Sequence, residues 1–291
     1  MPIRIGEISY TNILPMFYYV DRDKLREMGC EFIPAIPSEL NAGMSKGKID
    51  VGGISSFSYA EHIHDYELLP DLSVSSPKAV GSIFLFSKIP IDELDGKQIA
   101  LTSSSATSVN LLKIILGSFY QQNVHYTTEA PDYEMMMADF DAALLIGDDA
   151  ILAKRNGNKH RYVYDLGEIW STETGYPMTY AVFAVRKDAA RKHHYELKEV
   201  MNEFHKSKYR TQLNQYEEMI QSIQQSYQGD ADFWRNYFAG LNNDLTKTHI
   251  EGLLYYFDLA YKQGLLKEPV QDIVIWNPET MSESVSLGGS E

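Results

Sequence analysis

A run of hydroxyl-bearing residues at 102–108 (TSSSATS) is the first place where this sequence could do chemistry. A short apolar strand is predicted before it at residues 99–101, and an apolar helix after it at residues 109–116. A strand, a polar turn and a helix in this order direct free backbone amides and the positive end of the helix dipole at an anion. The pattern predicts an anion site, although an ordinary Ser or Thr N-cap explains the same residues without a ligand. The candidate binding residues are Ser103, Ser104, Ser105, Ala106 and Thr107.

The rest of the sequence narrows the kind of anion. Neither a G-x-G-x-x-G fingerprint nor a G-x-x-x-x-G-K phosphate loop occurs, so a nucleotide is not expected. The chain has 40 Asp and Glu residues and a formal charge of −14, yet residues 72–91 and 96–128 contain no acid. A like charge close to a bound anion in a partly dry cleft weakens binding. We therefore expect these two runs to face one site, and the ligand to be a carboxylate or a similar small anion.

Two series of alternating strands and helices are predicted to position this turn, one beginning at residue 3 and one at residue 98. Such alternation is typical of parallel sheets with crossover helices. Strand-like connections near residues 84–89 and 183–187 join the series, and helical spacing of apolar residues follows from residue 189. We expect an α/β fold of two lobes with a ligand cleft between them and a helical C-terminal segment. The predicted boundaries give lobe 1 residues 1–87 plus 187–291, and lobe 2 residues 88–186.

Ligands of open α/β sheets bind outside the carboxyl ends of the strands, which here places several polar turns at one cleft. Residues 10–12, residues 55–58 and Ser82 from lobe 1 would face residues 103–108 and 147–149 from lobe 2. Closure of a hinge between the lobes would then exclude water from the ligand. Further candidates at this cleft are Asn12, Ser55, Ser56, Ser82 and Asp148.

Each of these candidates also has a purely structural interpretation. Asn12 could be the N-cap of a helix that starts at Leu14, and Ser82 could be a satisfied hydroxyl in an apolar strand. Ser55 and Ser56 are ordinary caps unless the cleft argument holds. Asp148 and its neighbouring acid could form a general acid–base pair, but adjacent carboxylates before a helix are usually caps and dipole partners.

Composition limits the classes of partner. A net charge of −14 argues against nucleic acid and against an anionic membrane surface, since both need clustered Lys and Arg. The single cysteine, Cys30, lies in an apolar run, and no Cys/His spacing indicates a metal site. The N-terminus has no signal-peptide pattern, and no apolar run approaches the roughly 20 residues that span a bilayer. A cytoplasmic protein that acts on a small molecule is expected, and the oligomeric state is left open.

Several motifs in order along the chain resemble chorismate dehydratase, the first enzyme of the futalosine route to menaquinone. The resemblance covers residues 3 to about 265 and includes the Ser/Thr turn at 102–108. The other motifs that carry it are ISYTNILP at 8–15, GISSFSYA at 53–60, VGSIFLFS at 80–87, LIGDDA at 145–150, YDLGEIW at 164–170 and TGYPMTYA at 174–181.

This resemblance implies a type II periplasmic-binding-protein fold that works as an enzyme without a cofactor. The implied reaction removes water from chorismate and gives 3-[(1-carboxyvinyl)oxy]benzoate. The implied catalytic positions are Asn12 and Ser82. Because neither side chain is a strong base, we expect a substrate-assisted reaction in which the enolpyruvyl carboxylate takes the ring proton. The two carboxylates of chorismate would suit the two hydroxyl-rich helix starts at Ser55 and Ser105.

Two alternatives share the expected fold, so fold cannot separate them. One is a non-catalytic binding protein for a small carboxylate inside the cell. The other is the sister enzyme of the same route, a cyclase that acts on dehypoxanthine futalosine. That family begins with a Ser-Pro-x-x-Asn-Asp type of motif, whereas residues 9–15 here read SYTNILP, which favours the dehydratase.

Overall fold

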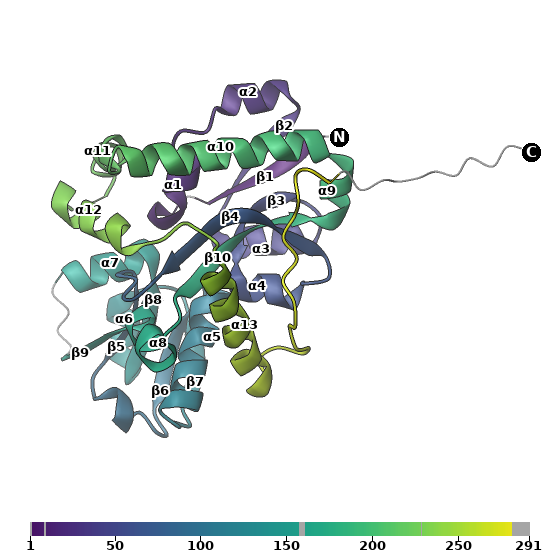
Figure 1. Cartoon of the computed structure of the whole chain (residues 1–291). Helices are drawn as coiled ribbons and strands as arrows, with labels where there is room; N and C mark the ends of the chain where they lie inside the picture. Colours follow the sequence, from purple (N-terminus) through teal and green to yellow (C-terminus); the bar gives the residue numbers. More distant parts are fainter. Residues whose placement is uncertain (1, 9, 157–160, 228, 281–291) are drawn as a thin grey trace, which may run out of the picture.

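The computed structural model describes residues 2–8, 10–156, 161–227 and 229–280. Their strands form two separate five-stranded sheets, which lie in the upper and lower halves of Figure 1. The first sheet, in the order β2-β1-β3-β10-β4, consists of β1 (Ile3–Ile8), β2 (Cys30–Ala35), β3 (Val51–Ser55), β4 (Tyr66–Ser76) and β10 (Met178–Arg186). The second sheet, in the order β7-β6-β8-β5-β9, consists of β5 (Ile83–Ser87), β6 (Gln98–Thr102), β7 (His125–Glu129), β8 (Ala142–Ile146) and β9 (Tyr162–Asp165).

Helices connect the strands within each lobe. The first lobe contains η1 (Thr11–Ile13), α1 (Leu14–Phe17), α2 (Arg22–Glu27), α3 (Pro37–Ser45) and α4 (Ser56–Glu61). The second contains η2 (Ile91–Glu93), α5 (Ala106–Ile114), the π-helical turn η3 (Ile115–Phe119), α6 (Tyr133–Asp139), α7 (Gly147–Arg155) and α8 (Leu166–Thr174). The C-terminal segment contains α9 (Lys187–Lys192), α10 (His194–Leu213), α11 (Glu217–Ile223), α12 (Ala231–Gly240) and α13 (Lys247–Lys262).

Strand pairing confirms the predicted α/β alternation. In the first sheet β1 runs parallel to both β2 and β3, and in the second sheet β6 runs parallel to both β7 and β8. The carboxyl ends of β1, β3, β6 and β8 each lead into a polar turn or helix start, as the sequence predicts. This arrangement, repeated in the two lobes, is what places those turns beside one cleft.

Both predicted lobe boundaries fall one strand too late in the chain. Strand β5 pairs antiparallel with β8 and β9 and therefore belongs to the second sheet, not to lobe 1. Strand β10 pairs antiparallel with β3 and β4 and belongs to the first sheet, not to lobe 2. Both strands are almost entirely buried apolar runs, and such a run fits either sheet equally well. Only the long-range pairing decides which sheet each strand joins.

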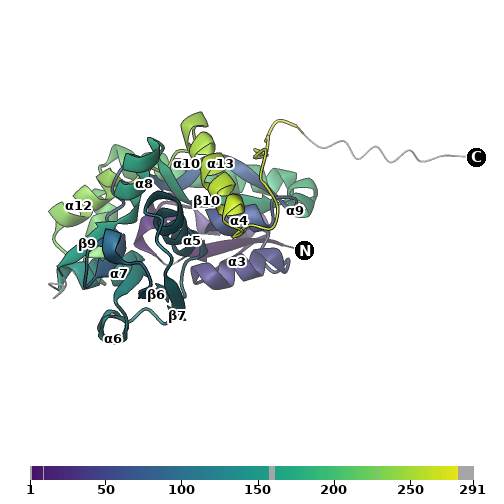
Figure 2. The same cartoon turned by 90° about the horizontal axis from the view of Figure 1, so that it is seen from below.

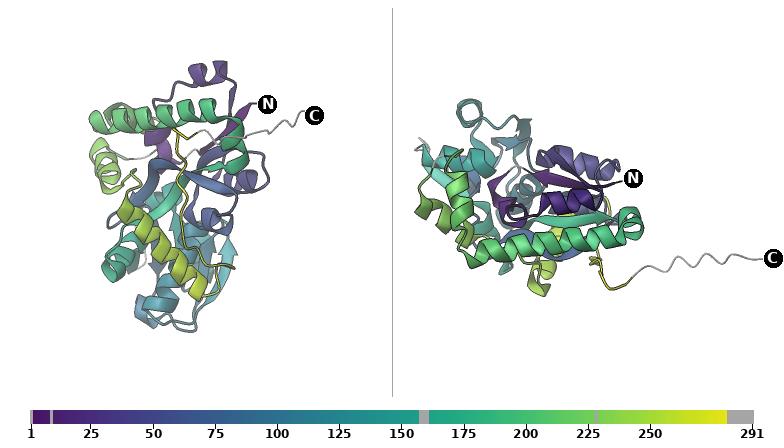
Figure 3. Two further views of the ribbon diagram at one scale, coloured as in Figure 1. Left: turned by 45° about the vertical axis from the view of Figure 1, so that its right-hand side comes forward. Right: turned by 90° about the horizontal axis from the view of Figure 1, so that it is seen from above.

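The C-terminal helices contact both lobes. Helix α10 runs along the outside of the first lobe (Figure 3), and its Phe204 ring packs edge-on against Phe17 of α1 and Phe183 of β10. Helix α13 lies beside α4 and α5 in the view from below (Figure 2), and it also packs on β10. The predicted helical character beyond residue 189 is confirmed. None of the helices in the part of the chain that the structure describes is long and apolar enough to cross a membrane.

Candidate functional site

A cleft between the two lobes encloses about 590 Å³ of empty space, including its open mouth. No Asp, Glu, Lys, Arg or His is found among the described residues that line it. Val74, Ser82, Ser104, Ser105 and Ser108 of the lining come from the two acid-free runs, so the prediction that these runs share one site is confirmed.

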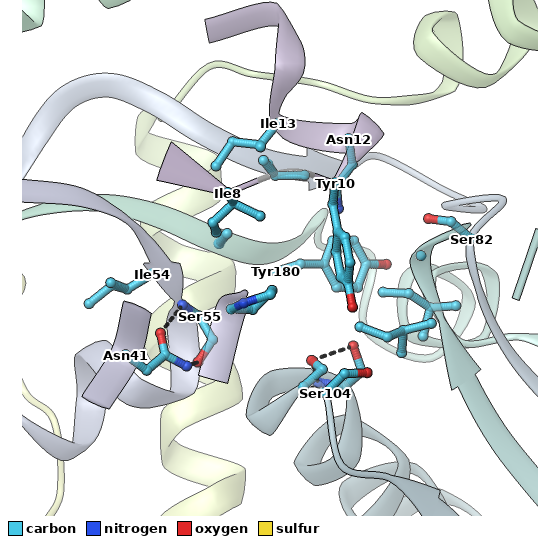
Figure 4. A pocket seen from close by; sticks show the side chains of 18 residues that line it. Ile8, Tyr10, Asn12, Ile13, Asn41, Ile54, Ser55, Ser82, Ser104 and Tyr180 are labelled. Carbon is cyan, nitrogen blue, oxygen red and sulfur yellow. Dashed lines mark hydrogen bonds between the residues drawn. The ribbon is translucent and has the colours of Figure 1, made fainter. Parts of the chain in front are cut away.

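The lining comes from strand ends of both sheets, drawn as sticks in Figure 4. From the first lobe it includes Ile8, Tyr10, Asn12, Ile13, Pro37, Asn41, Ile54, Ser55, Val74, Tyr180 and Ala181. From the second lobe it includes Ser82, Ile83, Ser104, Ser105, Ser108, Ile146 and Gly147. Apolar walls with a few neutral polar groups suit a ligand that has an apolar body and needs orientation by hydrogen bonds.

Asn12 and Ser82, the two catalytic candidates, both line the cleft. Figure 4 draws them on the same side as Tyr10. Asn12 lies inside the 3₁₀ turn η1 and is not the N-cap of α1, because Ile13 occupies that position. Ser82 precedes β5 and is 1% exposed, and its Oγ accepts a hydrogen bond from Tyr237 Oη at 3.1 Å. The capping interpretation of Asn12 is therefore wrong, whereas Ser82 is both a satisfied hydroxyl and a residue of the cleft.

Ser55 lines the cleft while it also caps α4. Its Oγ accepts hydrogen bonds from Ser58 N at 3.1 Å and from Asn41 Nδ2 at 3.3 Å, and its own amide donates to Asn41 Oδ1 at 3.2 Å. These bonds hold Ser55 and Asn41 as one unit on the side of the cleft opposite Ser82 (Figure 4). Ser55 is thus a cap, as the sequence indicates, and it also lies at the cleft, where its role as a ligand donor stays a prediction.

The start of α5 has the features that the sequence predicts for an anion site. Ser104, Ser105 and Ser108 line the cleft, and Ser105 is the N-cap, with its Oγ accepting from Ser108 N at 3.1 Å. The backbone amides of Ala106 and Thr107 in the first turn have no hydrogen-bond acceptor among the described residues. These two residues do not line the cleft themselves, but their free amides and the positive end of the helix dipole lie next to the lining residue Ser105.

At the start of α4, in contrast, two of the first-turn amides already have acceptors. The amide of Phe57 donates to Thr107 Oγ1 at 3.0 Å, and the amide of Ser58 donates to Ser55 Oγ. The predicted pairing of two helix starts with two carboxylates therefore stays a prediction, and α4 offers fewer free amides for it than α5. Thr107, a candidate ligand, is buried at the contact between α4 and α5, where its side chain holds the two lobes together.

Three further candidates do not line the cleft. Ser56 is fully buried and donates to Thr179 O at 2.8 Å, so it fixes α4 to β10. Ser103 is exposed, and its amide donates to Glu129 O at 3.0 Å. Ala106 contributes no side-chain group and lies outside the lining. These three predictions fail for the same reason. Neighbouring residues in a tight turn point in different directions, and only some of them reach the cleft.

Asp148 lies behind the cleft and does not line it. Its Oδ1 accepts a hydrogen bond from Thr11 Oγ1 at 2.7 Å, which ties α7 of the second lobe to η1 of the first. Burial raises the pKa of the Asp148 carboxyl, while hydrogen bonds from Thr11 and Tyr227 act in the opposite direction. The structure therefore does not support Asp148 as a ligand residue, and its hydrogen bond with Thr11 is a contact between the two lobes.

The charge of Asp148 leads to a prediction about stability. A raised pKa means that the folded protein holds this proton more tightly than the unfolded chain, so ionisation lowers stability as pH rises from the unfolded value through the folded one. Asp148→Asn keeps an oxygen to accept from Thr11 but removes the charge. We expect its Tm to exceed that of the wild type by a few degrees at about pH 7, and the difference to vanish below about pH 4. Thermal unfolding followed by circular dichroism at both pH values measures this, with the exposed Asp139→Asn on α6 as the matched control. A lower Tm for Asp148→Asn at neutral pH would contradict it.

Sequence reasoning does not find Asn41 or Tyr180 as site residues, and it places Tyr10 and Ser108 at the cleft without a role. Asn41 lies in the middle of α3 and Tyr180 within β10, where no turn or cap marks them. Tyr10 is the clearest omission, because its ring lies against Gly147 of the second lobe and its side chain points towards Ser104 in Figure 4. Burial raises the pKa of Tyr10, so the phenol stays protonated and is a hydrogen-bond donor in the cleft.

Residues suited to metal binding are not gathered here. In the described ranges no group of three or more His, Cys, Asp or Glu side chains is arranged to hold a metal ion. The polar groups of the cleft are amides, hydroxyls and phenols, which bind and orient an anion through hydrogen bonds.

Solved structures establish the fold by similarity. A protein from Archaeoglobus fulgidus superimposes with a TM-score of 0.72 at 20% identity, covering 91% of this chain and 98% of that one. The alkanesulfonate-binding protein SsuA from Xanthomonas axonopodis pv. citri, bound to MOPS, gives a TM-score of 0.68 at 15% identity, with 92% and 95% covered. The periplasmic aliphatic sulphonate binding protein SsuA from Escherichia coli gives 0.66 at 15% identity, with 92% and 94% covered. The expected two-lobed periplasmic-binding-protein fold is confirmed.

Sequence comparison identifies the family. A family model described as menaquinone biosynthesis matches residues 3–262. A curated chorismate dehydratase from Thermus thermophilus is 32% identical over 203 residues, which is 64% of this chain and 71% of that protein. The family match spans both lobes and includes every residue of the cleft. The chain belongs to the menaquinone biosynthesis family.

Proposed function

We propose that the protein dehydrates chorismate to 3-[(1-carboxyvinyl)oxy]benzoate, the first step of the futalosine route to menaquinone. The observation that carries this proposal is that Asn12 and Ser82 line one cleft in a chain of this family. They are the two positions that the resemblance implies for catalysis, and they come from different lobes. The curated relative is a chorismate dehydratase, and the assignment extends its activity to this chain.

The chemistry of the cleft supports this reaction. Chorismate loses the proton at C3 and the hydroxyl at C4, which leave together as water, and the ring becomes aromatic. Much of the driving force is therefore in the substrate, and the protein needs to position and stabilise charge. In this scheme the enolpyruvyl carboxylate of the substrate takes the proton from C3 and passes it to the hydroxyl that leaves C4, so that water departs and the carboxylate is regenerated. Asn12 and Ser82 hold that carboxylate through neutral hydrogen bonds, while the free amides at the start of α5 suit the ring carboxylate.

An uncharged site is suited to this task for an electrostatic reason. A Lys or Arg beside the enolpyruvyl carboxylate would stabilise its charge and lower its basicity, which would weaken it as the proton acceptor. Neutral donors orient the group with a smaller effect on its pKa. We propose a cytoplasmic location as well, because the curated relative is a biosynthetic enzyme, although the sulfonate-binding neighbours are periplasmic.

The test is to incubate the purified protein with chorismate and to separate the products by chromatography with mass detection. We expect a product lighter by one water that retains the enolpyruvyl group. Ser82→Ala protein prepared in parallel controls for contaminating enzymes that consume chorismate. Unchanged chorismate, in a buffer where the Thermus thermophilus relative converts it, would contradict the proposal. A thermal shift with chorismate but no product would then favour a binding protein.

A further inference from the structure

Helix α12 of the C-terminal segment reaches the catalytic candidate Ser82. Tyr237 Oη donates a hydrogen bond to Ser82 Oγ at 3.1 Å, and the two residues are 7% and 1% exposed. The two partners are 155 positions apart in the sequence. No motif of the sequence analysis includes Tyr237, and it is not among the residues that line the cleft. Tyr237 thus contacts a residue of the lining without lining the cleft itself.

The fold holds the Tyr237 ring in a fixed place. Asp230 caps α12 by accepting from Phe233 N at 2.7 Å, and Trp234, Tyr237 and Phe238 form the buried face of the helix. Trp234 packs edge-on against the Tyr237 ring with centroids 5.8 Å apart. Three aromatic side chains at i, i+3 and i+4 spacing therefore anchor the helix and leave the phenol little freedom to move.

The backbone around Ser82 is also held by hydrogen bonds. Asp165 accepts from Val80 N at 3.0 Å and from Gly81 N at 2.7 Å, and Ser82 O accepts from Gly147 N at 2.7 Å. Gly81 has φ +74°, and a Cβ at that position would lie 3.5 Å from the Tyr237 ring. Glycine is favoured at this position by the positive φ, while a Cβ there would make only an ordinary contact with the ring. With the main chain held in this way, what remains adjustable at Ser82 is its side-chain rotamer and the direction of its hydroxyl proton.

Tyr237 determines that direction. Burial raises the pKa of the Tyr237 phenol, and the nearby carboxylates of Asp148 and Asp165 raise it further, so the phenol remains protonated. Its single proton goes to Ser82 Oγ. Because the Ser82 oxygen accepts this hydrogen bond, its own proton must point away from Tyr237. Ser82 lines the cleft, so the cleft is open to that proton.

We propose that Tyr237 is a positioning residue that holds the Ser82 hydroxyl with its proton directed into the cleft, towards an anionic oxygen of the substrate. This inference rests on the proposed function and adds a residue from outside the cleft to it. Without the phenol, the Ser82 hydroxyl rotates freely and can turn its lone pair towards a substrate carboxylate. The donor that stabilises charge is then present for only part of the time.

The test is a double-mutant cycle on chorismate turnover. Tyr237→Phe keeps the ring and its packing but removes the hydroxyl, and we expect kcat to fall about tenfold with KM changed less than about twofold. In the Ser82→Ala background the same change should have no further effect, because the group that it positions is gone. Tyr66→Phe is the matched control, since Tyr66 is fully buried on β4 and its hydroxyl has no partner among the described residues. It should leave kcat unchanged.

The outcomes separate this inference from the proposed function. Two outcomes would overturn the positioning role alone, provided that the wild type converts chorismate. In one, the kcat losses of the two substitutions multiply in the double variant, and in the other, Tyr237→Phe has the kcat of the wild type. A loss that Tyr66→Phe shares would assign the effect to stability, and it too would overturn the role. A wild type that does not convert chorismate would overturn the proposed function and this inference with it.

Discussion

Ser82→Ala and Asn12→Ala are each expected to lower kcat for chorismate by about 10²–10³-fold, which is the usual loss when one preorganised donor is removed from a water-poor site. The reason is the neutral character of the cleft, where no charged side chain among the described residues shares the task. KM should change less than kcat if these donors act mainly on the charge that develops during proton transfer. Steady-state kinetics by product chromatography measures both constants.

Two further variants sharpen this first prediction. Ser103→Ala removes a hydroxyl from the predicted anion-binding turn, but Ser103 is exposed and does not line the cleft, so turnover should stay at the wild-type level. Asn12→Asp keeps the shape and adds a negative charge beside a dianionic substrate, so KM should rise well above that of Asn12→Ala. Near wild-type turnover in both alanine variants would contradict the substrate-assisted scheme.

Sequence signals predict what is local in this site. A hydroxyl-rich turn between a strand and a helix marks a helix start wherever it occurs, and the turns at Ser55 and Ser105 do cap α4 and α5. The acid-free runs at 72–91 and 96–128 place two distant segments at one cleft, because repulsion from a bound anion acts on every residue near it. Both predictions need no knowledge of how the lobes dock.

What the sequence cannot supply depends on that docking. Thr107 and Asp148 have the residue types of ligands, yet Thr107 accepts from Phe57 N and Asp148 accepts from Thr11, each across the two lobes. No local pattern distinguishes a hydroxyl that faces a ligand from one that faces the other lobe. Tyr237 is a stronger case, because it acts through a contact between residues 155 positions apart.

Three hydrogen bonds around the cleft also show why it has its shape. Gly147 N donates to Ser82 O within the second lobe, while Thr11 donates to Asp148 and the amide of Phe57 donates to Thr107 across the two lobes. Each of these three hydrogen bonds connects two elements that both lie beside the cleft. Thr107 and Asp148 are therefore supports that fix the lining residues in place, so their substitution should alter activity through geometry.

Gly147→Val is expected to lower kcat/KM by about a hundredfold, the effect of displacing a site by roughly 1 Å. Gly147 has φ +59°, and a Cβ there would lie 3.4 Å from the Tyr10 ring, so the two methyl groups of valine would press on a side chain of the lining. Gly96→Val is the matched control, because Gly96 has φ +70° but a Cβ at that position would have no neighbouring atom within 4 Å. Both variants carry the same backbone strain, about 1–2 kcal/mol or more for a β-branched residue, so both should unfold at a lower temperature. If strain alone matters, the two lose activity equally. A loss confined to Gly147→Val, at equal loss of thermal stability, assigns the effect to the contact between Tyr10 and Gly147 that joins the lobes across the cleft.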